Sequence, residues 1–157
     1  MDRVEKEGED YGYATFIDSI DTVIMGRRTY EWVMSRVENF PHADKDTYII
    51  TREMRQRVGN TRFYADDLKE LIAKLKMKGG KDIFVDGGAE VVRMMMADHL
   101  LDELIISIIP VILGGGKRLF ADQLQETDLE LIKSETFATG LVQLVYRIPK
   151  KMPFQSN

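Results

Sequence analysis

The chain contains no cysteine and only two histidines among its 157 residues. Without cysteine it forms no disulfide, carries no thiolate nucleophile and offers no sulfur ligand to a metal. His42 and His99 stand alone, with no ligand spacing around either, so we expect no metal site. The sequence also lacks the Gly-x-Ser-x-Gly elbow of serine hydrolases and the glycine-lysine spacing of a P-loop. These absences argue against thiol, metal-dependent and phosphotransfer chemistry.

Long apolar runs and an excess of basic residues are missing as well. The longest apolar run, residues 104–113, contains Ser107 and Pro110 and is too short to cross a bilayer. The first ten residues are rich in charge and lack the apolar segment of a signal peptide. The formal net charge of −4 gives no basic footprint for nucleic acid. We therefore expect a cytoplasmic protein without membrane or nucleic-acid partners.

The sequence does contain enough apolar residues, 44%, for one folded domain over residues 1–157. Apolar periodicity predicts helices over 10–20, 27–37, 67–77 and 88–97, the first capped by Asp10. It predicts strands over 22–25, 47–51, 61–64, 82–86, 104–113, 128–137 and 141–148. Helices and strands alternate before strands follow alone. This order predicts an α/β fold: a three-layer α/β/α sandwich on a mixed, mostly parallel sheet with an antiparallel C-terminal hairpin.

The first candidate site lies where the strand 22–25 runs through Gly26 into a helix that begins with Arg27, Arg28 and Thr29. Backbone N–H groups at a helix N-terminus attract anions, and the helix dipole adds to this attraction. Two guanidinium groups and a hydroxyl supply further donors for phosphate. The alternative interpretation is a turn glycine followed by two solvated arginines.

The second candidate site is Gly87-Gly88, between the strand 82–86 and the next helix. Paired glycines allow a ligand to approach the backbone closely, and the amides of Ala89 and Glu90 open the helix. An ordinary strand-to-helix turn is the alternative. Asp86, directly before the glycines, is either a catalytic acid or the cap of the turn.

A third segment, Thr51-Arg52, follows the strand 47–51. A hydroxyl beside a guanidinium suits the 2′-phosphate of NADP, although an arginine on the surface is the alternative. Ligands of parallel sheets bind at the carboxyl ends of the strands, where all three segments lie. Together they predict a bound dinucleotide and a nicotinamide-dependent reductase. The turn Gly114–Gly116 before Lys117 and Arg118 either holds a substrate phosphate or is simply flexible.

These segments together resemble the dihydrofolate reductase superfamily, and look most like the branch containing the reductase domain of the riboflavin-biosynthesis deaminase/reductase. The segments that carry the resemblance are residues 23–31, 49–52, 84–90 and 101–116, the last with the stretch IPVILGGG. The resemblance implies an NADPH-dependent oxidoreductase similar to 5-amino-6-(5-phosphoribosylamino)uracil reductase. It also implies a homodimer.

Position by position, the resemblance assigns roles to ten residues of the cofactor site. Cofactor phosphates would be held by Gly26, Arg27, Arg28 and Thr29. The adenosine 2′-phosphate would be held by Thr51 and Arg52. The pyrophosphate and the nicotinamide ribose would be lined by Gly87, Gly88, Ala89 and Glu90. Asp10 stands at a spacing similar to that of the carboxylate of folate reductases, which makes it a catalytic candidate besides a helix cap.

Two departures from the family bear on the function. Family members usually begin with a strand carrying a Ser-Leu-Asp-Gly-like stretch, and this chain begins after that point, so we expect a gap in the sheet. The loop 40–45 lacks the arginine that folate enzymes use for the glutamate tail of their substrate. We therefore expect a reductase of a small pteridine-like, pyrimidine-like or carbonyl substrate. The alternative is an NADP-binding or assembly protein without turnover, because the first strand is missing.

Overall fold

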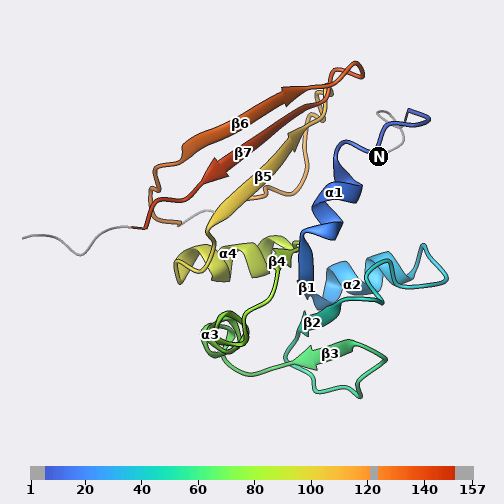
Figure 1. Cartoon of the computed structure of the whole chain (residues 1–157), viewed down its shortest axis with the longest axis vertical. Helices are drawn as coiled ribbons and strands as arrows, with labels where there is room; N and C mark the ends of the chain where they lie inside the picture. The colour runs from blue at the N-terminus through green and yellow to red at the C-terminus, as the bar shows by residue number, and fades with distance from the viewer. Residues whose placement is uncertain (1–5, 121–123, 151–157) are drawn as a thin grey trace, which may run out of the picture. The chain divides into compact units, whose positions relative to one another are not determined.

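A computed structural model describes residues 6–120 and 124–150 of the chain (Figure 1). They divide into two compact units, which we describe separately. The first, here called the parallel unit, contains residues 12–98, 118–120 and 124. The second, the antiparallel unit, contains residues 6–11, 99–117 and 125–150. That residues 1–157 form a single domain stays a prediction.

The parallel unit is built on a four-stranded sheet with the strand order β3-β2-β1-β4. Its strands are β1 (Ile20–Gly26), β2 (Asp46–Ile50), β3 (Thr61–Tyr64) and β4 (Asp82–Val85). All three neighbouring pairs are parallel. The central strand β1 is the most buried, and Val23, Ile24 and Met25 are fully inaccessible to solvent. This follows from the apolar run of β1, which is typical of a strand covered on both faces.

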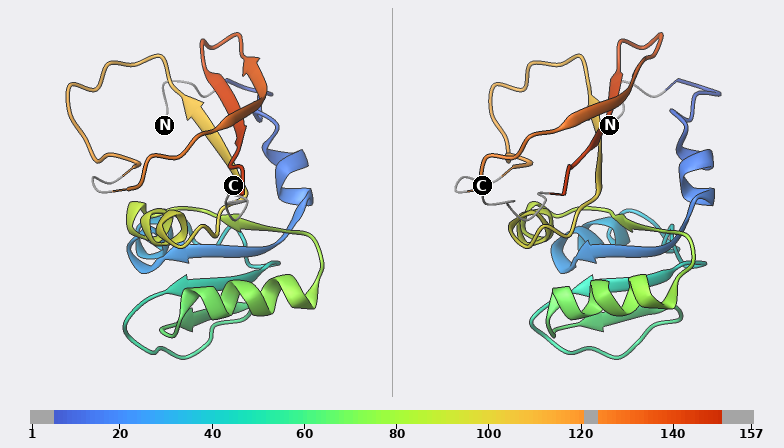
Figure 2. Two further views of the ribbon diagram at one scale, coloured as in Figure 1. Left: turned by 90° about the vertical axis from the view of Figure 1, so that its left-hand side faces the viewer. Right: turned by 60° about the vertical axis from the view of Figure 1, so that its left-hand side comes forward.

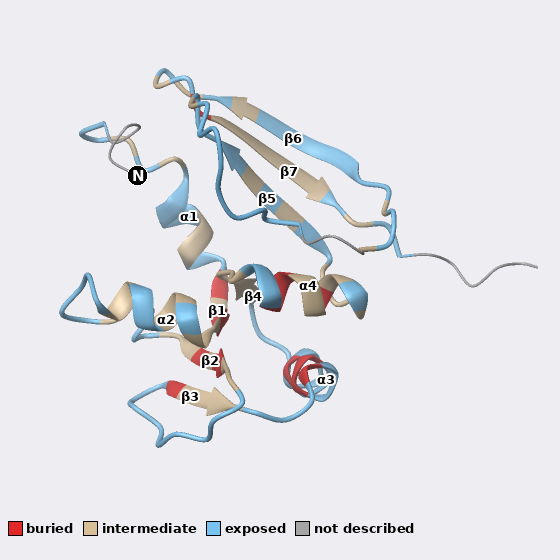
Figure 3. Cartoon of the chain, turned by 180° about the vertical axis from the view of Figure 1, so that it is seen from behind, coloured by how far each residue is buried: buried red, intermediate tan, exposed pale blue. Residues whose placement is uncertain are grey.

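Helices cover both faces of the parallel sheet, as Figures 1 and 2 show. They are α1 (Tyr13–Asp18), α2 (Arg27–Met34), α3 (Leu68–Lys78) and α4 (Ala89–Ala97). On the face of α1 and α2, aromatic side chains such as Phe16 and Tyr30 pack on the buried residues Val23 and Met25. On the other face, α3 and α4 supply the buried side chains of Leu68, Leu71, Ile72, Leu75, Val91, Val92 and Met95 (Figure 3). The predicted helix–sheet–helix layering is thus present within this unit.

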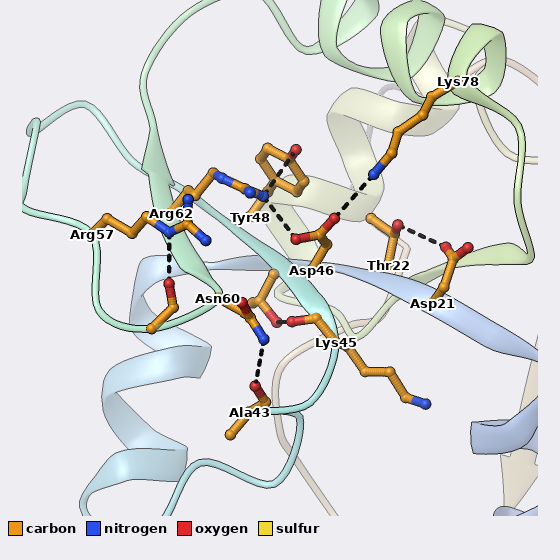
Figure 4. Close-up of polar contacts among 12 residues, drawn as sticks. Asp21, Thr22, Ala43, Lys45, Asp46, Tyr48, Arg57, Asn60, Arg62 and Lys78 are labelled. Carbon is orange, nitrogen blue, oxygen red and sulfur yellow. Dashed lines mark hydrogen bonds and ion pairs between the residues drawn. The ribbon is translucent and has the colours of Figure 1, made fainter.

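Polar side chains form a network at the end of the parallel sheet where β2 begins (Figure 4). Asp46 accepts hydrogen bonds from Arg62 Nη1 at 3.0 Å and from Lys78 Nζ at 3.2 Å. Burial opposes the charge of Asp46, but these hydrogen bonds outweigh it, so its pKa is lowered. The network connects β2 to β3 and to the end of α3, and so holds these three elements together.

The antiparallel unit contains a three-stranded sheet with the order β5-β7-β6. Its strands are β5 (Glu103–Ile108), β6 (Glu130–Thr136) and β7 (Val142–Arg147). β7 pairs with both neighbours in antiparallel orientation. Gly140, with φ +83°, turns the chain between β6 and β7, and its N–H donates to the Phe137 carbonyl at 2.9 Å. The predicted C-terminal hairpin and the α/β class with a mainly parallel sheet are confirmed.

Several predicted element boundaries are wrong, among them the end of the helix predicted over 27–37, which ends at Met34, and two have a clear physical cause. The first helix begins at Tyr13 rather than at residue 10, because Tyr11 and Gly12 both have positive φ, at 55° and 76°. Asp10 therefore does not cap it. The strand expected over 104–113 ends at Ile108, because Pro110 has no N–H and the Val111 N–H turns back to the Ile109 carbonyl at 2.7 Å.

The seven strands form two hydrogen-bonded sheets instead of one mixed sheet. Among the described residues, β4 pairs only with β1 and β5 pairs only with β7. β4 and β5 are therefore edge strands of their own sheets, and the expected gap in the sheet stays a prediction. Within the described part of the chain, no helix combines the length and the apolar character that crossing a membrane requires.

Candidate functional site

The two glycine junctions predicted from the sequence lie side by side in the parallel unit. The Gly26 N–H donates a hydrogen bond to the Gly87 carbonyl at 3.1 Å. A Cβ atom on Gly88 would lie 3.1 Å from Thr29 Oγ1 and 3.8 Å from Gly26 Cα. Because β1 and β4 are parallel neighbours, both junctions leave the sheet at the edge formed by the carboxyl ends of its strands. One bound molecule can therefore contact both junctions.

The helices that follow these junctions begin without a side-chain cap. Neither Gly26, before α2, nor Gly88, before α4, offers a side chain to the first N–H groups of its helix. By contrast, the Asp67 carboxylate caps α3 and accepts from the N–H groups of Lys69 and Glu70 at 2.7 and 3.1 Å. Uncapped N–H groups are available to an anion, and the helix dipole favours one. The helix α1, after Gly12, also lacks a side-chain cap, but only α2 and α4 begin at the two glycine junctions.

Arg27 belongs to a cluster of opposite charges rather than standing free in solvent. Its Nη1 lies 3.4 Å from Glu53 Oε2 and 3.7 Å from Glu31 Oε1. Arg55 contacts the same two carboxylates at 3.1 and 3.2 Å. The two carboxylates hold both guanidinium groups in place, so a phosphate at Arg27 must share the cation with Glu31 and Glu53. Arg28 is exposed, and its role stays a prediction.

The Thr51-Arg52 segment follows β2 and lies near the second glycine junction. The Thr51 N–H donates to the Tyr64 carbonyl at 3.0 Å, and Thr51 Oγ1 accepts from the Glu53 N–H at 3.1 Å. The pKa of Glu90 is lowered, mainly by its hydrogen bonds from Arg93 and to a smaller extent by the charge of Arg52. Arg52 and Glu90 are therefore close enough to interact. The charge of Arg52 thus acts on Glu90 at the start of α4, and the 2′-phosphate role of Thr51 and Arg52 stays a prediction.

The structure gives the two acidic candidates different positions. Asp10 belongs to the antiparallel unit, so its catalytic role stays a prediction. Asp86 does not cap α4, which has no side-chain cap, and its role as the cap of the turn stays a prediction. Its Oδ2 instead lies 3.5 Å from Nε2 of the buried His42. Local sequence patterns do not reveal this pair, because its two residues are 44 positions apart in the sequence and meet only in the fold. No group of three acidic or imidazole side chains fit for a metal occurs within residues 6–120 and 124–150.

Comparison with known proteins decides the family. Residues 17–143 match the family model described as the RibD C-terminal domain. The chain belongs to the RibD C-terminal domain family. This family lies within the dihydrofolate reductase-like superfamily, as the motifs indicated.

Two relatives from Bacillus subtilis (strain 168) extend the match over nearly the whole chain. YwjB is 39% identical over 147 residues, which cover 93% of this chain and 83% of YwjB. YyaP is 34% identical over 148 residues, which cover 87% of this chain and 79% of YyaP. Both are described as uncharacterized proteins, so they support the family without naming a reaction.

Solved structures of RibD-like proteins share the fold. A protein of Shewanella sp. PV-4, provisionally assigned to riboflavin biosynthesis, is 25% identical with a TM-score of 0.84, covering 96% of this chain and 88% of that one. A pyrimidine reductase-like protein of Corynebacterium diphtheriae is 14% identical with a TM-score of 0.67, covering 92% and 83%. RibD of Acinetobacter baumannii is 16% identical with a TM-score of 0.64, covering 92% and 52%. The last two likenesses concern the fold alone.

Proposed function

We propose that the chain is an NADPH-dependent reductase that transfers a hydride to a small heterocyclic or carbonyl substrate of the pteridine or pyrimidine type. Its place in the RibD C-terminal domain family supports this class of chemistry and a link to riboflavin biosynthesis. The observation that carries the proposal is the contact between the two glycine junctions, where the Gly26 N–H meets the Gly87 carbonyl at 3.1 Å. One diphosphate can face the uncapped helices α2 and α4 there.

The residues at this edge fit a dinucleotide. The backbone at Gly88 approaches Thr29 so closely that a Cβ atom would lie 3.1 Å from Thr29 Oγ1, so the Thr29 hydroxyl lies directly against the second junction. In the proposal the amides of α2 and α4 bind the pyrophosphate, and Thr29 and Arg28 add side-chain donors. Thr51 and Arg52 bind the 2′-phosphate, and Glu90 accepts from a ribose hydroxyl. When bound, NADPH would supply the hydride, while the protein orients the substrate and excludes water.

A titration with NADPH tests the proposal directly, with NADH as the control. We expect NADPH to bind and NADH to bind at least about tenfold more weakly, because one charge-assisted phosphate contact contributes roughly 1.5–3 kcal/mol. Calorimetry measures both affinities, and absorbance at the reduced-nicotinamide band measures oxidation in the presence of pterin or carbonyl substrates. A failure of NADPH to bind would contradict the proposal.

A second candidate is an NADP-binding or assembly protein without turnover. The edge strands β4 and β5 each have only one partner among the described residues, and an unpaired strand edge is a place where another chain can pair. NADPH binding without oxidation by any pterin or carbonyl substrate would support this candidate. Oxidation that requires a substrate would support the reductase.

A homodimer and a cytoplasmic location complete the proposal. One face of the antiparallel sheet is apolar, because Leu104, Ile106 and Ile108 stand opposite Tyr146, Leu144 and Val142 in register. Ile108 remains 51% exposed, which is unusual for an isoleucine in a strand. Sedimentation of the chain and of Ile108→Glu tests the dimer: the wild type should sediment as a dimer and the variant as a monomer. The location is tested by fractionating cells that express the chain.

A further inference from the structure

Four charged side chains near the start of α2 form a closed ring of ion pairs: Arg27, Glu31, Glu53 and Arg55. Arg27 Nη1 lies 3.4 Å from Glu53 Oε2 and 3.7 Å from Glu31 Oε1. Arg55 closes the ring, with Nη2 at 3.2 Å from Glu53 Oε2 and Nη1 at 3.1 Å from Glu31 Oε1. One oxygen atom, Glu53 Oε2, therefore serves both guanidinium groups, and the two arginines converge on a single anionic atom.

The ring joins the first predicted cofactor segment to the third. Arg27 opens α2 after the first glycine junction, and Glu53 comes two residues after Thr51. The Glu53 N–H donates to Thr51 Oγ1 at 3.1 Å, which closes a turn directly after β2. The guanidinium carbon of Arg55 lies 5.6 Å from the centroid of the Phe63 ring, and Phe63 packs on the buried core of the sheet. Arg55 is therefore a cation anchored beside residues to which the proposed function gives the cofactor phosphates.

Glu53 is the member of the ring that an incoming anion displaces most easily. Its side chain is 62% exposed, against 35%, 44% and 38% for those of Arg27, Glu31 and Arg55. Exposed ion pairs contribute little to stability, so moving the Glu53 carboxylate into solvent costs little. A phosphomonoester brings three acceptor oxygens and about two negative charges, which suits two guanidinium groups at once. Because two anions repel each other, it would replace Glu53 at these cations rather than share them.

We propose that Glu53 is a built-in competitor of the cofactor phosphate, and that Arg55 is a further cation of the same phosphate site. Without ligand, the Glu53 carboxylate contacts both arginines and balances their charge. The 2′-phosphate of NADPH displaces this carboxylate and takes its place at Arg27 and Arg55. Glu31, which is fixed on α2, keeps the two guanidinium groups oriented. This inference rests on the proposed function and deepens it, because it names a residue that sets how tightly the phosphate is bound.

Two fragments of the cofactor isolate this site. Adenosine 2′,5′-bisphosphate carries the 2′-phosphate, and 5′-AMP differs from it only by lacking that group. Calorimetry with the full chain should show that Glu53→Gln binds the bisphosphate about three- to fivefold more tightly than the wild type, which is the range of an exposed ion pair that no longer competes. The affinity for 5′-AMP should stay unchanged. Equal or weaker binding of the bisphosphate by Glu53→Gln would overturn the role of Glu53.

Two controls separate competition from a general effect of charge. Glu38→Gln removes the same charge from an exposed glutamate beyond the other end of α2, and should leave the affinity for the bisphosphate unchanged. In the double variant Arg27→Met, Arg55→Met the cations are absent, so the further change Glu53→Gln should bring no gain. An equal gain from Glu38→Gln, or a gain from Glu53→Gln that persists in the double variant, would overturn the proposal.

The role of Arg55 is tested with the opposite expectation. Arg55→Met keeps an apolar side chain against Phe63 but removes the charge, so the affinity for the bisphosphate should fall at least about tenfold, with 5′-AMP unaffected. The matched control is Arg57→Met, because Arg57 lies in the same loop and its Nε donates to the Gly59 carbonyl at 2.6 Å. An equal loss in the two variants, or no loss in Arg55→Met, would overturn the assignment of Arg55 to the phosphate site.

Failure of this inference is distinguishable from failure of the proposed function. The proposed function depends on NADPH binding to the wild type, whereas the inference depends on how the variants change the affinity for the bisphosphate. If NADPH binds but Glu53→Gln leaves the affinity for the bisphosphate unchanged, only the inference is refuted. If NADPH does not bind the wild type, the reductase proposal fails, and the bisphosphate titrations still decide the competition. Absence of bisphosphate binding in both the wild type and Glu53→Gln would overturn the inference.

Discussion

Gly88 and Thr29 approach each other across the two strand-to-helix junctions, so that a Cβ atom on Gly88 would lie 3.1 Å from Thr29 Oγ1. The contact joins residues 59 positions apart in the sequence. Gly88 also has φ +73°, a conformation that glycine adopts without strain. The close approach and the backbone angle both require glycine at this position, which makes Gly88 the residue through which to test the cofactor site.

Gly88→Ala should weaken NADPH binding by about tenfold, equivalent to ~1.4 kcal/mol, because the new methyl group displaces the Thr29 hydroxyl. The variant should also lose roughly 1 kcal/mol of folding stability from its positive φ. Calorimetry measures the first effect and urea denaturation the second. Gly59→Ala is the control, since Gly59 has φ +56° and nothing within 4 Å of an added Cβ. The Gly59→Ala variant should lose folding stability but keep its NADPH affinity. Equal NADPH affinity in both variants would contradict the assignment of Gly88 to the cofactor site.

Arg52→Ala should lower the affinity for NADPH but not the affinity for NADH. If Arg52 binds the 2′-phosphate, the variant loses at least about tenfold in NADPH affinity and keeps its NADH affinity, because only NADPH carries that group. Parallel titrations with both dinucleotides measure the ratio. Arg57→Ala serves as the matched control, because the Arg57 Nε donates to the Gly59 carbonyl at 2.6 Å in the same loop. An equal loss for NADPH and NADH would contradict a 2′-phosphate contact.

The sequence predicted best those elements whose signals are local. The helix predicted over 67–77 is α3, Leu68–Lys78, whose stripe of leucine and isoleucine is buried and whose first N–H groups are capped by Asp67. The strand 61–64 was predicted with its observed bounds. The glycine junctions were also found from local patterns, since a glycine between a buried strand and a helix is visible without knowledge of the fold.

The features that could not be predicted depend on contacts between residues distant in the sequence or on backbone angles. Nothing in the residues around Asp10 indicates that Tyr11 and Gly12 turn left-handed and delay the helix. Likewise, Asp86 looked like a turn residue, because its partner His42 comes from another loop. The charge cluster of Arg27 with Glu31 and Glu53 is hidden for the same reason. Local patterns locate a site, whereas its electrostatics depend on the fold.

Gly80→Ala should destabilise the parallel unit more than Gly79→Ala. The Lys81 N–H donates to Asp21 Oδ2 at 2.7 Å, and a Cβ atom on Gly80 would overlap that carboxylate. Gly80 also has φ +127°, which is hardly accessible to alanine, so we expect a loss of roughly 2 kcal/mol or more. Gly79, with φ +70° and ψ −176°, is also strained for alanine, but nothing lies within 4 Å of an added Cβ, so its variant should lose the strain of roughly 1–3 kcal/mol without the overlap.

Urea denaturation of the two glycine variants measures this difference. A second background, Asp21→Ala, removes the overlapping carboxylate and should shrink the gap between the Gly80 and Gly79 variants. A gap that stays the same in that background would mean that the backbone angle, and not the contact with Asp21, sets the cost at Gly80.

Asp46→Asn should lower the free energy of unfolding at pH 7 and flatten its decline in acid. The pKa of Asp46 is lowered from the ordinary 3.8: burial opposes the charge, but the hydrogen bonds from Lys78 and Arg62 outweigh it. A carboxyl group with a lowered folded-state pKa stabilises the protein fully above its unfolded-state pKa. That contribution disappears as the pH falls through the folded-state value. The wild type should therefore lose its advantage over Asp46→Asn below about pH 4.

Urea denaturation of both proteins, from about pH 7 down to about pH 3, measures this convergence. The control removes the cations instead of the carboxylate, in the double variant Arg62→Met, Lys78→Met. Without these partners only burial acts on the ionised Asp46, and it opposes the charge, so in that background the Asn substitution should no longer cost more stability at pH 7 than in acid. A stability gap between the wild type and Asp46→Asn that does not change with pH would mean that the ion pairs of Asp46 do not stabilise the edge of the sheet where β2 begins.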